Sequence, residues 1–308
     1  MSGLVAVTGA TGFIGQNLIG KLVNSGHKVR ALTRHSRPNT KLINWVTGTL
    51  DDRAALEQLV SGASAIVHCA GRVRGSSHQQ FLHTNLEGTI NLLRVTVAQK
   101  PQPKFLLVSS LAAREPQLSW YADSKRQTEQ YLIENAGTVR WTIFRPTAVY
   151  GPGDREMAPL FKATRLGLLP MTGPPAARFG LIYVDDLVAA ILCWLDMDKV
   201  VRGVYELDDG TPGGYDHEAV KKIASRIWKR PVCTLLVPIS IIRLLASLNL
   251  GLARLFHYSP MLTPGKVREL QHPDWVCNIE ELTRTIGWRP VRQLQNALQQ
   301  AILPAEKT

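Results

Sequence analysis

The first half of the chain alternates short apolar runs with segments of helical periodicity. Short apolar runs bounded by glycine or polar residues are typical of buried strands. The segments between them repeat apolar residues at intervals of three and four, as amphipathic helices do. Strands and helices in alternation predict βαβ units and a parallel sheet. The predicted strands are Leu4–Thr8, Lys28–Thr33, Ile43–Val46, Ala65–His68, Lys104–Ser109 and Arg140–Arg145, and the predicted helices are Gln16–Ser25, Asp52–Ser61, Phe81–Ala98 and Tyr121–Asn135.

The pattern changes after Arg145, where prolines and glycines interrupt the apolar periodicity. Long irregular segments of this kind often carry binding functions. Strands over Leu181–Val184 and Gly203–Leu207, with a helix between them, are predicted to return to the sheet. We therefore predict the α/β class, with a doubly wound parallel sheet of Rossmann type and a smaller, mostly helical substrate-binding subdomain. The predicted boundaries are 1–150 for the Rossmann domain, with 181–208 returning to it, and 151–180 and 209–308 for the subdomain.

Composition is that of an ordinary globular protein, with 45% apolar and 19% charged residues, but the formal net charge is +12. Such an excess favours polyanionic partners or anionic lipid surfaces, and it also suits a basic surface that binds an anionic cofactor. No helix-turn-helix, zinc-finger or RNA-binding motif accompanies the charge, so we exclude nucleic acid as a partner. The four cysteines are far apart, which predicts free thiols and no metal site. The start of the chain lacks a signal-peptide pattern, so we expect a cytoplasmic protein, with peripheral membrane attachment left open.

The segment Leu235–Phe256 is unusually apolar, yet Pro238, Arg243 and Arg254 interrupt it. It therefore falls short of the roughly 18 uncharged residues expected of a membrane-spanning helix. A buried helix or a lid over an apolar substrate is the first interpretation, and a helix lying at a membrane interface is the second.

A glycine-rich turn, TGATGFIG at residues 8–15, connects the first strand to the first helix. Glycines permit the tight turn, the approach of a pyrophosphate to the backbone and close helix–strand packing. The N-terminus of the following helix offers N–H groups and a positive dipole end to phosphates. Because the turn follows a strand and opens a helix, it predicts a dinucleotide-binding site.

The end of the second strand is basic where an NAD-binding domain carries a carboxylate for the ribose 2′-hydroxyl. The sequence there reads VRALTRHSR and contains Arg34 and Arg37 but no acidic residue. A guanidinium suits a 2′-phosphate because it forms a bidentate, charge-assisted pair. We therefore predict NADP(H) as the cofactor in preference to NAD(H).

Tyr121 and Lys125 are four residues apart in a helical segment, YADSK, so both project from one face. A tyrosine titrates near ~10, and a neighbouring ammonium favours the phenolate and lowers that pKa, which suits proton exchange with a substrate. Upstream, Ser109 and Ser110 end a strand, where a hydroxyl could bind a substrate oxygen or merely cap the turn. Asn85 could hold a water or the backbone beside Lys125, or it could be a helix-bend residue.

The motifs together resemble the extended short-chain dehydrogenases/reductases, in the atypical, reductase-like group of the NAD-dependent epimerase/dehydratase family. TGATGFIG, HCAG, NLEGT, VSS, YADSK, RPTAVYGPGD and YVDDL occur in that family's order over roughly the first 190 residues. The resemblance implies an NAD(P)-dependent oxidoreductase in which Ser110, Tyr121 and Lys125 are catalytic and Asn85 supports them. The VRALTR strand end resembles NADP-using members such as dihydroflavonol reductase-like enzymes. The cofactor-binding residues expected from the patterns and the resemblance are Gly9, Thr11, Gly12, Phe13, Ile14, Gly15, Arg34, Arg37, Leu50, Asp51, Ala70, Gly71, Tyr121, Lys125 and Pro146.

The spacing between the serine pair and Tyr121 departs from that of the family's sugar-nucleotide epimerases, which have a longer loop there. We therefore expect hydride transfer to or from a ketone or secondary alcohol on a bulky, apolar small molecule. One alternative is a nucleotide-sugar epimerase or dehydratase, in which Arg155, Arg165 or Arg178 would hold the diphosphate. Another is a non-catalytic NADP(H)-binding structural or sensor subunit. The resemblance also implies a homodimer formed through the helices that include Tyr121.

Overall fold

The computed structural model describes residues 3–171, 173–197 and 202–302. The parts of the predicted domains that fall on residues 1–2, 172, 198–201 and 303–308 lie outside the described residues. The chain forms two compact units. The N-terminal unit comprises Met1–Val73, Ser77–Arg145 and Ile191–Tyr205, and the C-terminal unit comprises Arg74–Ser76, Pro146–Ala190 and Glu206–Thr308. The stretch that returns to the N-terminal unit is shorter than the 181–208 expected from the sequence.

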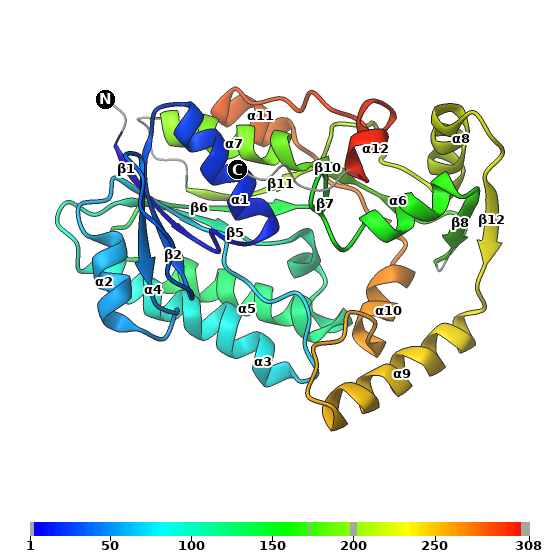
Figure 1. Cartoon of the computed structure of the whole chain (residues 1–308), viewed down its shortest axis with the longest axis horizontal. Coiled ribbons are helices and arrows are strands. Elements are labelled where there is room, and N and C mark those ends of the chain that lie inside the picture. Colours follow the sequence, from blue (N-terminus) through cyan, green and yellow to red (C-terminus); the bar gives the residue numbers. More distant parts are fainter. Residues whose placement is uncertain (1–2, 172, 198–201, 303–308) are drawn as a thin grey trace. The chain divides into compact units, whose positions relative to one another are not determined.

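A seven-stranded sheet forms the centre of the N-terminal unit, in the order β11-β6-β5-β4-β1-β2-β3 (Figure 1). The strand pairs from β6 to β3 are parallel. The chain proceeds outward from β1 to β3 and then crosses back to β4, so the strand order reverses between β1 and β4. In open α/β sheets, ligands bind at this reversal, beyond the carboxyl ends of the strands. The strands are β1 (Leu4–Thr8), β2 (Lys28–Thr33), β3 (Ile43–Thr47), β4 (Ala65–His68), β5 (Lys104–Val108), β6 (Trp141–Pro146) and β11 (Gly203–Leu207).

Helices cover both faces of this sheet, with α1 on one face and α2, α4 and α5 on the other (Figure 1). A continuous apolar core joins the second layer to the strands, and it includes Leu56 of α2, Leu92 of α4 and Phe105 of β5. Burial of these strands on both faces explains their nearly continuous apolar sequences. The helices are α1 (Phe13–Asn24), α2 (Arg53–Val60), α3 (His78–Leu82), α4 (Gly88–Val97) and α5 (Trp120–Asn135), with a π-helical turn, η1 (His83–Glu87), between α3 and α4.

The structure confirms the predicted Rossmann-type sheet, and most predicted elements agree with it to within a residue or two at each end. Two helices differ. The first begins at Phe13 rather than Gln16, because Gly12 is its N-cap and the glycine turn leads directly into it. The helix predicted over Phe81–Ala98 instead begins at His78 and contains the π-helical turn, which apolar periodicity does not reveal.

The C-terminal unit has its own core and small two-stranded sheets. Its core packs Tyr150, Phe161 and Tyr215 against residues of α8 and α12. The carboxylate of Asp154 accepts hydrogen bonds from the backbone N–H groups of residues 156–158 and so supports the start of α6. Its further elements, including α7, which runs on into the N-terminal unit, are β7 (Ala148–Tyr150), α6 (Ala158–Arg165), β8 (Leu168–Met171), β9 (Arg178–Phe179), β10 (Leu181–Tyr183), α7 (Val184–Asp196), α8 (His217–Trp228), β12 (Cys233–Leu236), α9 (Ile239–Leu255), α10 (Pro264–Gln271), β13 (Asp274–Trp275), α11 (Glu280–Ile286) and α12 (Leu294–Ala301).

The apolar segment Leu235–Phe256 is not a buried core helix. It forms the end of β12 and helix α9, and most of the leucines of α9 are exposed, with Leu244 60% and Leu255 68% accessible. Of the helix, Ile242, Ala246 and Ala253 are buried. Among the described residues, no helix is long and apolar enough to cross a membrane.

Candidate active site

The glycine turn brings β1, the end of β4 and the start of α1 into close contact. Gly9 has a φ of +67°, and a Cβ there would lie 2.5 Å from the backbone nitrogen of Ala70. A Cβ on Gly15 would lie 2.1 Å from the backbone oxygen of Gly9. Both positions therefore require glycine, one for the turn and one for the packing of the helix on the strand.

Gly12 differs from the other two glycines because its missing side chain faces more open space. A Cβ there would meet the Gly9 oxygen at 3.2 Å and no other atom within 4 Å among the described residues. Gly12 is the N-cap of α1, and no side chain of the described residues caps this end of the helix. The first-turn N–H groups are therefore available to an anion, and the helix dipole favours one there. This cradle fits the pyrophosphate of a dinucleotide.

The basic end of β2 carries both predicted arginines on the surface. Arg34 and Arg37 are exposed, and the guanidinium of Arg37 lies 5.1 Å from the centre of the Trp45 ring. The Thr33 hydroxyl donates to the backbone oxygen of His35 and holds the turn after the strand. No carboxylate stands in the sequence of this turn. The strand end therefore offers guanidinium donors and, in its own sequence, no carboxylate acceptor.

A buried histidine, which the sequence analysis did not single out, connects the end of β1 to the start of α4, just after the π-helical turn. The ring nitrogens of His68 lie 2.5 Å from Thr8 Oγ1 and 2.9 Å from Thr89 Oγ1. Thr89 uses its proton on the backbone oxygen of Asn85 at 2.6 Å, so Nε2 of His68 is the donor to Thr89 and Nδ1 accepts from Thr8. Burial, and secondarily the charge of Lys125, lowers the pKa of His68 to about 3. The imidazole is therefore neutral near pH 7 and serves as a fixed link between the two segments.

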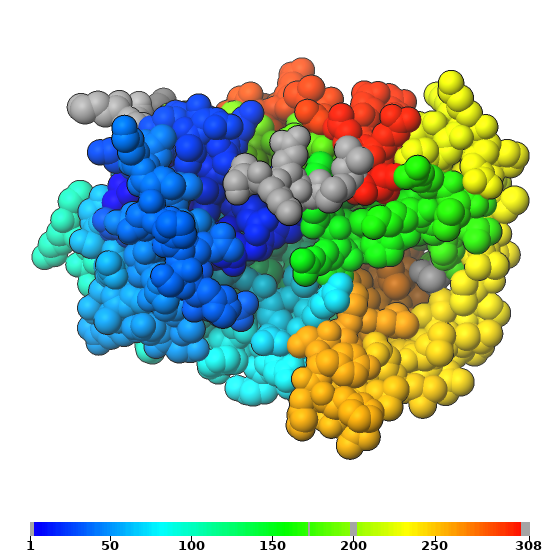
Figure 2. Space-filling view, in the orientation of Figure 1, coloured from blue at the N-terminus to red at the C-terminus, as the bar shows by residue number. Residues whose placement is uncertain are grey.

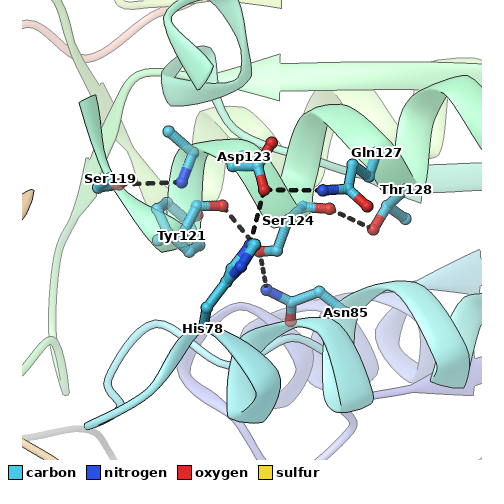
Figure 3. A network of polar contacts seen from close by, with 9 residues as sticks. His78, Asn85, Ser119, Tyr121, Asp123, Ser124, Gln127 and Thr128 are labelled. Atoms are coloured by element: carbon cyan, nitrogen blue, oxygen red, sulfur yellow. Dashed lines mark hydrogen bonds and ion pairs between the residues drawn. The ribbon is translucent and has the colours of Figure 1, made fainter. Parts of the chain in front are cut away.

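Asn85 lies in the π-helical turn and is buried, and its amide makes contacts in two directions. Its Oδ1 accepts from the backbone N–H of Arg72 at 2.7 Å. Its Nδ2 donates to Ser124 Oγ at 2.8 Å (Figure 3). A Cβ on Gly71 would lie 3.4 Å from Asn85 Oδ1 and 3.3 Å from Lys125 Nζ. The structure thus brings the predicted residues Gly71, Asn85 and Lys125 together. Single π-turns are frequent at functional sites.

Helix α5 carries Tyr121 on its first turn. Ser119 caps the helix by accepting from the backbone N–H of Ala122 at 3.0 Å. The ring of Tyr121 meets that of Phe81 edge-on, with 6.3 Å between their centres. Asp123 accepts from Gln127 and pairs with the imidazole of His78 at 2.7 Å, so α3 is held against α5 (Figure 3). These contacts fix the first turn of α5, from which the tyrosine projects.

Lys125 lies one helical turn after Tyr121 and is buried, with 5% of the residue accessible. Its Nζ donates to the backbone oxygen of Val108, the last residue of β5, at 3.0 Å. Burial lowers the pKa of this ammonium to about 8, although the Glu129 carboxylate acts in the opposite direction. Lys125 is therefore still largely charged at pH 7 and can favour a neighbouring phenolate.

The two serines after β5 have different environments. Ser109 is buried and its hydroxyl donates to Glu129 Oε1 at 2.5 Å, whereas Ser110 is half-buried and caps the short 3₁₀ turn η2 (Leu111–Arg114) through the N–H of Ala112. The turn η2 packs against α5. Ser110 is thus the partly exposed serine of the pair, and it begins a turn that packs against α5.

Glu129 was missed by the sequence analysis, although it lies four residues after Lys125 on the same face of α5. It is 1% exposed and forms a bidentate pair with Arg145 of β6, with the shortest contact 2.6 Å. Together with Ser109 it joins α5 to the ends of β5 and β6. The repeated spacing of four from Tyr121 through Lys125 is the signal that could have identified it.

Three further residues predicted to bind the cofactor have other surroundings. Asp51 is exposed and its carboxylate lies 3.4 Å from His83 Nε2. The side chain of Leu50 packs over Gly88 at the start of α4. Pro146 is buried at the end of β6, in the C-terminal unit. Among the described residues, no group of three or more His, Cys, Asp or Glu side chains could hold a metal ion.

Comparison with protein families gives a match over most of the N-terminal two thirds of the chain. A model described as the NAD dependent epimerase/dehydratase family matches residues 5–207. A ceramide reductase of Caulobacter vibrioides is 34% identical over 305 residues, which cover 93% of this chain and 94% of that enzyme. A UDP-glucose 4-epimerase of Vibrio cholerae is 25% identical over 323 residues, which cover 96% and 93% of the two chains.

Solved structures resemble the whole chain. A UDP-glucuronic acid 4-epimerase from Bacillus cereus, in complex with UDP-glucuronic acid and NAD, superposes with a TM-score of 0.76 and covers 97% of this chain and 98% of its own. The two sequences are 18% identical, so this likeness concerns the fold.

Proposed function

The chain belongs to the NAD dependent epimerase/dehydratase family and is an NAD(P)-dependent oxidoreductase-type enzyme, and on this basis we propose that it transfers a hydride between NADP(H) and a ketone or secondary alcohol of a lipid-like substrate. The observation that carries the proposal is the arrangement on α5. Tyr121 projects from a fixed first turn, and the buried ammonium of Lys125 follows one turn later on the same face. These are the groups that reversible proton exchange with a substrate oxygen requires.

Each residue of the proposed site has a separate task. When bound, the nicotinamide supplies or accepts the hydride. In the direction of reduction, Tyr121 Oη gives its proton to the substrate oxygen, and Ser110 Oγ donates a hydrogen bond to that oxygen as negative charge develops on it. The Lys125 ammonium stabilises the phenolate that remains until a proton returns from solvent. Asn85 holds Ser124 and the backbone at Arg72, and so keeps α5 and the segment after β4 in place.

The cofactor preference is proposed from the end of β2. Arg34 is exposed and basic at the position where NAD-binding domains carry a carboxylate. The proposed set at the dinucleotide is Gly9, Thr11, Gly12, Phe13, Ile14 and Gly15 at the turn, Arg34 and Arg37 at the 2′-phosphate, Leu50 and Asp51 toward the adenine, and Ala70, Gly71, Tyr121, Lys125 and Pro146 along the remainder. Titration of the purified protein with NADPH and NADH, followed by nicotinamide fluorescence, tests this preference, and equal affinities would contradict it.

The substrate class is supported by the Caulobacter vibrioides relative that matches nearly the whole chain, whose name states reduction of a ceramide, a lipid. The short connection between Ser110 and Tyr121 also distinguishes this chain from the sugar-nucleotide epimerases. We therefore propose a long-chain ketone or alcohol as the substrate. Incubation with NADPH and a panel of long-chain ketones, compared with short-chain ketones of the same head group, tests the class. Turnover of the short ketones alone would contradict it.

A second candidate is nucleotide-sugar epimerisation, which the similarity to the Vibrio cholerae enzyme over nearly the whole chain favours. Arg155, Arg165 and Arg178 are the residues proposed for the diphosphate. In the structure Arg178 pairs with Asp216 at 3.2 Å, so its charge is already partly compensated. Binding of UDP by calorimetry would favour this function. Bound cofactor that no ketone or sugar nucleotide oxidises or reduces would instead favour a structural or sensor role.

A further inference from the structure

Apolar side chains form an exposed stripe along helix α9. Figure 2 shows this segment at the surface of the molecule. The exposed residues recur at intervals of three and four, so they occupy one side of the helix. On an ideal helix they span about 100° of its circumference and run along a length of about 21 Å. We call this stripe the α9 face; it comprises Ile241, Leu244, Leu245, Leu248, Leu252 and Leu255, which are 48%, 60%, 51%, 55%, 49% and 68% exposed.

The other side of α9 is already in contact with its own unit. Ile242 and Ala246 pack with Val267 of α10 in a small core. Asn249 Nδ2 donates to the backbone oxygen of Leu262 at 2.8 Å, and Arg243 donates to Gln271 at 3.0 Å. These contacts fix the rotation of α9 about its axis. The apolar face is therefore not the buried side of the helix, and its exposure does not reflect a helix that lacks packing.

The chain around α9 is strongly basic. Between Glu218 and Glu269 the sequence contains no acidic residue, and it contains nine lysines and arginines. All of them belong to the C-terminal unit. This charge complements a surface of anionic headgroups, and each basic residue close to such a surface adds to the attraction. The nine are Lys221, Lys222, Arg226, Lys229, Arg230, Arg243, Arg254, Lys266 and Arg268.

We propose that the α9 face docks on the surface of an anionic lipid bilayer, with the helix lying in the plane of the interface. An amphipathic helix with leucines on one side and arginine on the other, flanked by basic sequence, is suited to this position. The helix has 17 residues, including Arg243 and Arg254, and does not qualify as a spanning helix. A symmetric contact between two copies through the same face would instead oppose basic segments of like charge.

Vesicle sedimentation of the full chain tests the proposal without cofactor or substrate, so its result is independent of the proposed catalysis. The probes are vesicles of phosphatidylglycerol mixed with phosphatidylcholine, and vesicles of phosphatidylcholine alone. We expect the protein to sediment with the anionic vesicles, to bind the neutral ones at least about tenfold more weakly, and to be released by high salt. A wild-type protein that stays in the supernatant with anionic vesicles overturns the proposal.

Substitutions on the face separate docking from general charge attraction. Leu245→Glu with Leu248→Glu should reduce partition to anionic vesicles by about tenfold or more, because the face then loses apolar area and gains negative charge. Leu245→Met with Leu248→Met should retain binding. The matched control is Leu166→Glu with Val291→Glu, which also adds two charges at exposed apolar residues, 71% and 80% accessible, outside the face. Light scattering of each variant reports oligomeric state. Equal loss in the control, or a change of oligomeric state in the α9 variant with vesicle binding unchanged, overturns the assignment.

Discussion

The Nζ of Lys125 donates a hydrogen bond of 3.0 Å to the backbone oxygen of Val108, so the first half of α5 is fixed to the end of β5. Ser110 follows Val108 by two residues, and Tyr121 precedes Lys125 by one helical turn. The Lys125 side chain thus connects the helix that carries Tyr121 to the strand end that precedes Ser110. The ammonium is also removed from solvent, and this burial lowers its pKa to about 8.

Replacing Tyr121 with phenylalanine removes the proposed proton donor with little change in shape. We expect kcat for ketone reduction to fall by at least about 100-fold, because a positioned acid contributes at least that much. Cofactor affinity should change little, as measured by nicotinamide fluorescence. Tyr131→Phe, on the same helix and outside the proposed site, is the control. A Tyr121→Phe enzyme with most of its activity would remove this tyrosine from the mechanism.

The lowered pKa of Lys125 predicts a decline of activity in alkaline solution. The charged ammonium stabilises the Tyr121 phenolate, and it is lost as the pH rises through about 8. We therefore expect kcat/KM for the cofactor, which reports the free enzyme, to fall above about pH 8. A profile that stays flat to pH 10 would contradict this role of Lys125.

The same group predicts a stability effect of defined sign. Because the pKa of Lys125 is lower in the folded protein than its ordinary value of 10.5, the unfolded chain binds more protons between about pH 8 and 10.5. This lysine therefore makes the free energy of unfolding rise with pH in that window. Lys125→Met should abolish the contribution, so the free energy of unfolding of the wild type, minus that of the variant, should increase from pH 7 to pH 10. Denaturant titrations at pH 7 and pH 10 measure it, and a difference that does not depend on pH would contradict the burial of a charged amine.

The buried pair of Glu129 and Arg145 should matter for stability. Glu129→Ala removes the carboxylate that pairs with the buried guanidinium of Arg145, whose side chain is 11% exposed. Removing one member of a buried pair costs about 3 kcal/mol or more of unfolding free energy. Glu57→Ala, which breaks the exposed pair with Arg53, should cost much less, because solvent screens the pair. Similar losses in the two variants would show that the buried pair has no special structural role.

Arg34 is expected to determine the preference for a 2′-phosphate. Arg34→Ala should weaken NADPH binding by about tenfold or more, the effect of losing a charge-assisted hydrogen bond, and should leave NADH binding nearly unchanged. Lys41→Ala removes an exposed positive charge from the same unit and serves as the control for net charge. Equal losses for the two cofactors would mean that Arg34 does not contact the 2′-phosphate.

Much of the N-terminal unit could be predicted from the sequence, because its strands are buried on both faces and its turns carry glycine. The strands Leu4–Thr8, Lys28–Thr33 and Ala65–His68 agree with the prediction at both ends. The π-helical turn around Asn85 was not predicted, since it results from the fit between α3, α4 and α5 rather than from periodicity. The HCAG motif contains His68, but the connection that its side chain makes between Thr8 and Thr89 was not predicted. These two partners are distant from it in the sequence.

The environment of α9 could not be predicted from composition alone. An apolar segment of this length is buried in most globular proteins, and burial was the first interpretation. The structure shows that the contacts of α9 come from one narrow side, where Ala246 and Ala253 permit close packing. Most of its leucines are consequently exposed. Their exposure depends on which elements of the C-terminal unit pack against the helix.

Deuterium at both C4 positions of NADPH, followed during incubation with a long-chain ketone, distinguishes reduction from epimerisation most clearly. If the protein is a reductase with Tyr121 as its acid, the alcohol product contains one carbon-bound deuterium and an equal amount of NADP⁺ forms, and both fail to appear with Tyr121→Phe. If no label leaves the cofactor with any long-chain ketone, while a UDP-sugar is epimerised without net oxidation of cofactor, the central claim is wrong and the chain is an epimerase.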